Sequence, residues 1–182
     1  MASGASYILI PMEPLYQDEI ASPFGTVRFL FQDDGSLAEI HLPGCGCPEE
    51  TPLIRRRPAG APTKAELKRW LKQALVGGAE AFPGRWQLPG NTPFMKEIYR
   101  RVAAIPAGQA LSYGEVAAAA GRPKAARAVG SAMSKNPLPI LIPCHRVIGS
   151  DGSLTGFGGG LALKERMLVA EGWQPALKAE SV

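Results

Sequence analysis

The chain has 182 residues, of which 46% are apolar and 20% charged, a balance that is ordinary for a globular protein and allows a sizeable core in one domain or two small ones. No apolar run approaches the ~20 residues that span a membrane, which excludes a membrane-spanning helix. The net charge of +4 is uneven, since residues 93–173 hold ten Lys or Arg and five Asp or Glu. This basic half suits a polyanionic partner, although a solvated basic surface would look the same.

Cysteine usage indicates the compartment. Cys45, Cys47 and Cys144 are an odd number without a disulfide framework, and the first residues lack the basic segment and apolar stretch of a secretory signal. We therefore expect a reducing, intracellular location, which is the cytoplasm (or the nucleus in a eukaryote), and no membrane association.

Residues 1–82 predict a small α+β scaffold domain. Residues 7–11 are a strand candidate. Residues 25–32 alternate in polarity, turn residues follow at 33–36, and residues 37–42 form a second strand, which together indicate a β-hairpin with one buried face. Thr63 and Glu66 form a capping box, and apolar residues then recur at helical spacing until Gly77 and Gly78 end the helix. We find no chemistry in this part of the chain.

Cys45 and Cys47, near His41, raise the question of a metal. The spacing is tighter than the usual pair of zinc ligands, and a fourth ligand is missing. We therefore expect no metal, and free loop thiols rather than a zinc site.

Residues 83–91, rich in Pro and Gly, predict a linker to a mainly helical second domain at 92–174, followed by a tail at 175–182. Thr92 caps one helix, with Pro93 at its first position, and Ser112 opens another with a capping box. Further helices are expected at 123–134 and 161–172, the last with Leu161, Met167 and Leu168 inward. The two short helices before and after residues 121–123 are a helix-turn-helix candidate, a motif that reads DNA or simply packs.

The helix at 123–134 is unusual for a base-reading helix because it offers mostly methyl groups and one arginine. Small side chains let a helix backbone approach closely, which suits a minor groove with little sequence discrimination. Tight packing against a neighbouring helix would explain the same composition. The residues concerned are Lys124, Ala125, Ala126, Arg127, Ala128 and Gly130.

The stretch from 138 to 148 holds the candidate chemistry. Three apolar residues, read as a buried strand, run into Pro143, and Cys144, His145 and Arg146 follow. A thiolate is a strong nucleophile, and Cys144 needs a base or a positive field to form one. His145, oriented by Glu165, would complete a Cys/His/Glu relay, with a turn or a water between thiol and imidazole. A buried structural cysteine beside a satisfied histidine is the alternative.

The motif Pro143-Cys144-His145-Arg146-Val147, preceded by Ile140-Leu141-Ile142, resembles the active-site motif of the O6-alkylguanine-DNA alkyltransferases, also called methylated-DNA–protein-cysteine methyltransferases. The resemblance covers residues 92–173. It extends through Ser112-Tyr113, residues 123–133, Asn136-Pro137, the glycine loop 156–160 and Lys164-Glu165. For residues 1–82 it is one of layout only, and it implies a ribonuclease H-like N-terminal domain.

The resemblance implies that an alkyl group is transferred irreversibly from O6 of guanine to Cys144, without a cofactor. It implies the same transfer from O4 of an alkylated thymine. His145 would deprotonate Cys144 through a water, with Glu165 behind it, and Tyr113 would donate its hydroxyl to the flipped base. The implied partner is double-stranded DNA bound by a monomer. Arg127 would fill the gap in the base stack, with DNA contacts also from Ser112, Lys124 and the small residues of that helix. Asn136, Arg146, Val147, Phe157 and Gly158 would complete the substrate pocket.

Two residues depart from the family pattern, since Phe157 and Gly158 stand where many members carry Tyr and Ser. The exchange keeps the aromatic wall and the Gly158 amide but loses two hydroxyls. A non-catalytic lesion-binding relative would lack Cys144. A helix-turn-helix regulator would need polar base-reading side chains at 125, 126 and 128, and a cysteine hydrolase would place its thiol on a helix N-terminus or an exposed elbow.

Overall fold

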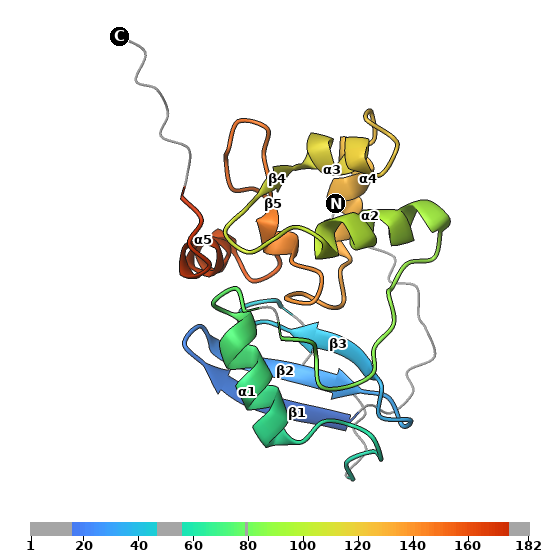
Figure 1. The fold of residues 1–182 in the computed structure, drawn as a ribbon, viewed down its shortest axis with the longest axis vertical. Coiled ribbons are helices and arrows are strands. Elements are labelled where there is room, and N and C mark those ends of the chain that lie inside the picture. The colour runs from blue at the N-terminus through green and yellow to red at the C-terminus, as the bar shows by residue number, and fades with distance from the viewer. Residues whose placement is uncertain (1–15, 47–55, 79, 175–182) are drawn as a thin grey trace, which may run out of the picture.

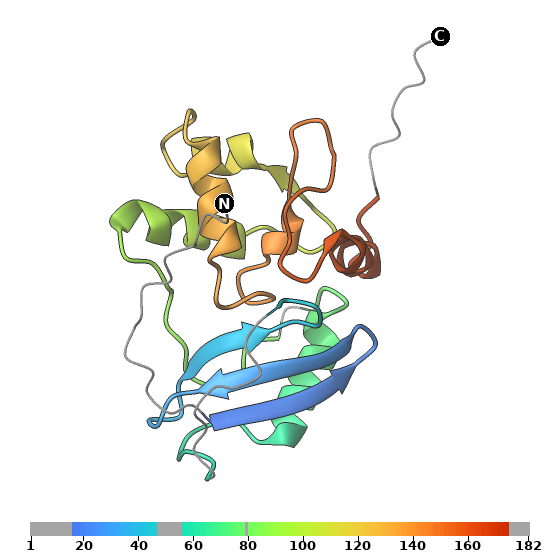
Figure 2. The same cartoon turned by 180° about the vertical axis from the view of Figure 1, so that it is seen from behind.

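The computed structural model describes residues 16–46, 56–78 and 80–174, which form two packed units (Figure 1). The sheet unit consists of a three-stranded sheet and helix α1, and the helical unit consists of α2 to α5 with a two-stranded pairing. The turned view in Figure 2 shows α1 on one face of the sheet and the helical unit beyond one edge. No helix in the described residues is long and apolar enough to cross a membrane.

The sheet is antiparallel, in the order β1-β2-β3, with β1 at Tyr16–Ser22, β2 at Gly25–Phe31 and β3 at Leu37–His41. The predicted hairpin is confirmed as β2 and β3. β1 is not predicted from the sequence, because four of its seven residues are polar and the alternation of apolar and polar residues is therefore weak. The strand expected at residues 7–11 lies outside the described residues.

Helix α1, at Lys64–Ala74, confirms the capping box. The Thr63 hydroxyl accepts from the Glu66 amide, and the Glu66 carboxylate accepts from the Thr63 amide. Trp70, buried on α1, packs edge-on against Phe29 of β2, with ring centroids 6.1 Å apart. One apolar stripe of the helix therefore covers one face of the sheet.

In the helical unit, four helices follow the predicted signals: α2 at Pro93–Ala103, α3 at Tyr113–Ala119, α4 at Ala126–Ser134 and α5 at Leu161–Ala170. α4 begins three residues later than expected, because the backbone at 122–125 forms a turn closed by the Ala125 amide on the Arg122 carbonyl. Leu161 was expected inward but is 47% exposed at the start of α5. α3 packs on α4, and α2 contacts both.

The buried strand predicted before Cys144 is wrong. Residues 138–142 form a turn in which the Ile142 amide donates to the Leu138 carbonyl, and Ile140 takes a φ of 78°. Pro139 and Pro143 have no N–H for a strand ladder, which explains the difference. A strand does occur, but after the thiol: β5, at Val147–Ile148, pairs in parallel with β4, at Leu111–Ser112.

The two units touch directly rather than through a free linker. The Ile40 amide of β3 donates to the Pro137 carbonyl at 2.8 Å, and Leu37 pairs with Trp86 in the segment between the units. Arg166 of α5 donates to the Pro23 carbonyl and lies over the Phe24 ring. The turn that leads to Cys144 is therefore held against the sheet unit.

Candidate active site

Cys144 begins the short 3-10 helix η1 (Cys144–Arg146) directly after Pro143. Its side chain is buried, with the residue 8% exposed. Burial raises the pKa of the Cys144 thiol, while a hydrogen bond with the Asn136 side chain and the positive charge of Lys164 act in the opposite direction. The resting thiol is therefore neutral, and it needs a base to become a nucleophile.

Asn136 holds the turn that carries the thiol. Its amide nitrogen donates to the Ile142 carbonyl at 2.8 Å, and its amide oxygen accepts from the Leu138 amide at 3.1 Å. Both ends of the turn are thus joined to one side chain, and the position of Cys144 is set by Asn136 as well as by the prolines.

His145 is 1% exposed, and in the described residues its ring makes no direct hydrogen bond with Cys144, although its backbone amide does. Its Nε2 lies 3.0 Å from Oε1 of Glu171, and its Nδ1 is buried without a protein partner. Burial lowers the pKa of His145, and the Glu171 carboxylate only partly offsets this. A neutral ring that donates Nε2–H to the carboxylate leaves Nδ1 as a bare acceptor, which is what a general base requires.

The carboxylate beside His145 is Glu171, so the assignment of this role to Glu165 is wrong. On α5 the buried residues are Leu163, Lys164, Met167 and Leu168, and Glu165 is exposed on the other side. Glu171 follows Lys164 by seven residues, nearly two full turns, and so returns to the same face. Its side chain is only 2% exposed. Helical periodicity extended past residue 170 would have found it.

Arg146 was assigned to the substrate pocket, and the structure corrects this. Its guanidinium makes two hydrogen bonds with the Glu171 carboxylate, at 2.8 and 2.7 Å, and a third with the Ile105 carbonyl. Burial would raise the pKa of Glu171, but the hydrogen bonds from His145 and Arg146 outweigh it and lower that pKa. Arg146 therefore keeps the partner of His145 ionised.

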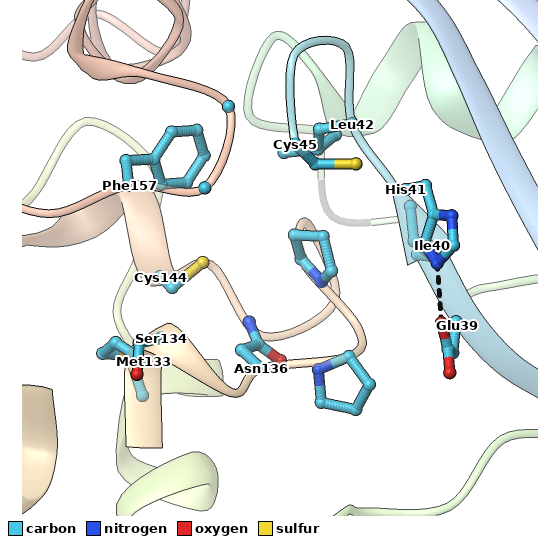
Figure 3. A pocket seen from close by; sticks show the side chains of 14 residues that line it. Glu39, Ile40, His41, Leu42, Cys45, Met133, Ser134, Asn136, Cys144 and Phe157 are labelled. Atoms are coloured by element: carbon cyan, nitrogen blue, oxygen red, sulfur yellow. Dashed lines mark hydrogen bonds and ion pairs between the residues drawn. The ribbon is translucent and has the colours of Figure 1, made fainter. Parts of the chain in front are cut away.

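The pocket in front of Cys144 is a cavity of about 190 Å³ with walls from both units (Figure 3). Phe157 and Cys144 lie on the side of the helical unit, and Leu42 and Cys45 face them from the sheet unit. The expectation that the N-terminal part is only a scaffold missed this wall. Cys45 is disulfide-bonded, so the expectation of a free thiol at this position is wrong. Cys47 lies outside the described residues.

No group of three or more His, Cys, Asp or Glu suited to a metal occurs in residues 16–46, 56–78 and 80–174. Near Cys45, His41 already shares its Nε2 with Glu39 at 2.6 Å.

Tyr113 starts α3 and is not among the residues that line the pocket; it lies against the start of the glycine loop instead. Its hydroxyl donates to the Thr155 carbonyl at 3.3 Å, a long hydrogen bond, and Gly130 of α4 lies against its ring. Ser112 caps α3 by accepting from the Glu115 amide, so its hydroxyl is already engaged. Val147 is fully buried directly after η1, and the Gly158 backbone lines the pocket.

The residues expected to touch DNA divide into two groups. Lys124, Arg127 and Ala128 are exposed, whereas Ala125, Ala126 and Gly130 are half-buried where α4 packs on its neighbours. The outer face of α4 thus presents one arginine among small side chains.

These features define a class, a thiol-centred α+β protein with a His/Glu pair behind the thiol. A model of the "6-O-methylguanine DNA methyltransferase, DNA binding domain" family matches residues 93–173. The methylated-DNA–protein-cysteine methyltransferase of Methanosarcina acetivorans is 43% identical over 107 residues, 59% of this chain and 68% of that protein. The chain belongs to the methylated-DNA–protein-cysteine methyltransferase family.

Two further relatives bear on how far the likeness extends. The enzyme of the same name from Salmonella typhimurium is 54% identical over 84 residues, so the match spans 46% of this chain and about half, 49%, of that protein. The crystal structure of Mycobacterium tuberculosis OGT in complex with DNA superposes with a TM-score of 0.69 at 33% identity, and covers 86% of this chain and 92% of that one. The likeness in fold therefore includes the sheet unit.

Proposed function

We propose that this protein repairs DNA by transferring the alkyl group from O6 of a guanine in duplex DNA irreversibly to Sγ of its own Cys144. The observation that carries the proposal is the buried Cys144 thiol at a pocket, next to a histidine whose Nδ1 is free and whose Nε2 is held by Glu171. Membership of the family and the fold shared with the Mycobacterium tuberculosis protein, solved with DNA, support it.

The transfer begins with the thiol proton. His145 Nδ1 takes it through a bridging water, and Glu171 stabilises the imidazolium that forms. The thiolate then attacks the alkyl carbon, so that a C–S bond forms while the C–O6 bond breaks and its electron pair stays on guanine. The Tyr113 hydroxyl, held only weakly by Thr155, gives its proton to the purine ring, which neutralises the leaving base. One proton then passes from the His145 imidazolium to the Tyr113 phenolate, so both side chains return to their starting states. The net reaction converts the Cys144 thiol and the O6-alkylguanine into a thioether and guanine, with no other reactant.

The base must reach the thiol by leaving the duplex. Cys144 is 8% exposed, so a stacked guanine cannot contact it, and base flipping is the available route. In the proposal α3 and α4 act as a helix-turn-helix, with α4 in the minor groove and Arg127 in the gap of the stack. Lys124 would contact phosphates, and so would the hydroxyl proton of Ser112, because the Ser112 amide already donates to the Glu115 carboxylate at 2.7 Å.

Each part of the chain has a role in this proposal. The protein acts as a monomer, in which residues 92–174 bind DNA and carry out the transfer. Residues 83–91 connect them to residues 1–82, a ribonuclease H-like domain that supplies the far wall of the pocket. O4-alkylthymine would enter the same pocket, since it presents the same alkyl–oxygen bond.

The test is intact-protein mass after incubation with a duplex that contains O6-methylguanine, compared with Cys144→Ala. We expect one added methyl group on the wild type and none on the variant, with peptide mapping that assigns the group to Cys144 rather than Cys45. Binding of the duplex without any mass gain would overturn the transfer and identify a lesion-binding protein.

A further inference from the structure

Lys164 is a buried cation that the proposed transfer does not use. It lies on α5 with 0% of its surface exposed. An ammonium group is rarely buried completely, because loss of hydration is costly unless hydrogen bonds or a counter-charge replace it. Within the described residues, no carboxylate lies within ion-pair distance of its Nζ. Hydrogen bonds to backbone carbonyls must therefore replace the lost hydration of this ammonium.

The ammonium joins three segments around the thiol. Nζ donates to the Val147 carbonyl of β5 at 2.6 Å and to the Thr155 carbonyl at 2.8 Å. The Thr155 carbonyl also accepts the hydroxyl of Tyr113. Thr155 leads into the glycine loop 156–160, whose Gly158 and Gly159 line the pocket. One side chain thus holds β5, the start of this loop and the acceptor of Tyr113 at a single point.

The same charge acts on the thiol. Lys164 is the positive side chain that favours the Cys144 thiolate, and burial lowers the pKa of Lys164 itself to about 8, so the side chain remains protonated near neutral pH. The other groups that act on Cys144 are neutral: the backbone amides of Cys144 and His145, the Asn136 side chain, and Tyr99, whose pKa burial and Cys144 raise to about 12. His145 follows Cys144 in the chain and is paired with Glu171.

We propose that Lys164 is a positioning residue for the transfer: its buried ammonium fixes the Val147 and Thr155 carbonyls, and so the Tyr113 hydroxyl, around the pocket, and its charge stabilises the Cys144 thiolate. The inference rests on the proposed function for its reaction, but its electrostatic part concerns the thiol alone. A lysine suits this role because three N–H donors on one charged centre can hold two carbonyls from different segments.

The experiment compares Lys164→Met, Lys164→Gln and Lys164→Arg with Lys68→Met, which removes a lysine exposed on α1. The first measurement is the alkylation rate of Cys144 by iodoacetamide from about pH 6 to 10, read by peptide mass without DNA. We expect the profile of the Met and Gln variants to move to higher pH, with Lys164→Arg closer to wild type. A purely structural brace would leave the profile in place.

The second measurement is single-turnover methyl transfer at saturating duplex, with affinity measured separately by fluorescence anisotropy. We expect the Met and Gln variants to transfer ~10–100-fold more slowly with similar affinity, and Lys68→Met to behave as wild type. Unchanged alkylation profiles and unchanged transfer rates would overturn the inference. If wild type itself transfers no methyl group, the proposed function fails, and the iodoacetamide profiles still decide the role of the charge. Should the Met variant fail to fold, the Gln and Arg variants carry the comparison.

Discussion

Glu171→Gln tests the contact on which the candidate mechanism depends. The carboxylate accepts three hydrogen bonds, from His145 Nε2 at 3.0 Å and from two Arg146 nitrogens at 2.8 and 2.7 Å. A glutamine of the same shape offers one acceptor oxygen and one amino group. Either orientation therefore turns a hydrogen bond with Arg146 into a contact between two donors, and the neutralised partner no longer stabilises a charged His145.

The size of the effect follows from burial. Breaking a buried ion pair by removal of one partner costs about 3–5 kcal/mol. The Arg146 side chain is 13% exposed, and in Glu171→Gln it keeps its hydrogen bond with the Ile105 carbonyl, which reduces this cost. We therefore expect the free energy of unfolding to fall by about 2–3 kcal/mol. General-base assistance contributes about 10²–10⁴-fold to a rate, and we expect methyl transfer to slow by an amount in that range.

The matched control is Glu165→Gln, which makes the same chemical change on the exposed face of α5. Urea denaturation gives the stability of both variants, and single-turnover methyl transfer followed by intact mass gives their rates. We expect Glu165→Gln to stay within about 0.5 kcal/mol and close to the wild-type rate. If Glu171→Gln transfers the methyl group at the wild-type rate, or if both variants are slowed equally, the assignment of Glu171 as the partner of His145 is refuted.

Two further predictions concern the glycine loop and acid pH. Gly159→Ala would place a methyl carbon 2.5 Å from Leu163 Cδ2 and 3.0 Å from the Pro43 carbonyl, whereas at Gly158 a Cβ meets nothing within 4 Å. In urea denaturation we expect Gly159→Ala to lose about 1–3 kcal/mol and Gly158→Ala almost nothing, and equal losses would contradict the packing argument. Since the pKa of Glu171 is lowered from 4.5, its stabilising effect is complete above that value and is lost as pH falls through the lower, folded-state pKa. Urea midpoints should therefore fall more steeply below about pH 5 for wild type than for Glu171→Gln, and parallel curves would show that Glu171 is not coupled to folding.

The pocket makes the sheet unit part of the candidate chemistry. Leu42 and Cys45 face the thiol across the cavity, and the Ile40 amide holds the Pro137 carbonyl in the turn before it. Substitutions in the sheet unit should therefore alter the shape of the pocket wall directly, and should also shift the turn that carries Cys144. The composition of residues 1–82 gave no indication of this, because the residues concerned are ordinary for an edge strand and a loop.

Local signals in the sequence were sufficient for most elements of secondary structure. The capping boxes at Thr63 and Ser112 and the proline at position 93 each lie within a few residues of the helix they start. Polarity alternation and a four-residue turn were enough for the β2–β3 hairpin. Such signals act over three or four residues, so they survive without knowledge of the rest of the fold. The motif around Cys144 was likewise readable, because the nucleophile and its histidine are adjacent in the chain.

Only the tertiary structure decided how that motif is supported. The turn at 138–142 replaces a strand because prolines and the φ of Ile140 prevent a ladder. The partner of His145 is Glu171 rather than Glu165, since the packing of α5 determines which carboxylate faces inward. The burial of Lys164, the engagement of Arg146 with Glu171 and the contact of both units at the pocket depend in the same way on residues distant in sequence. Burial, hydrogen-bond partners and pKa shifts are properties of the packed chain, and no short stretch of sequence contains them.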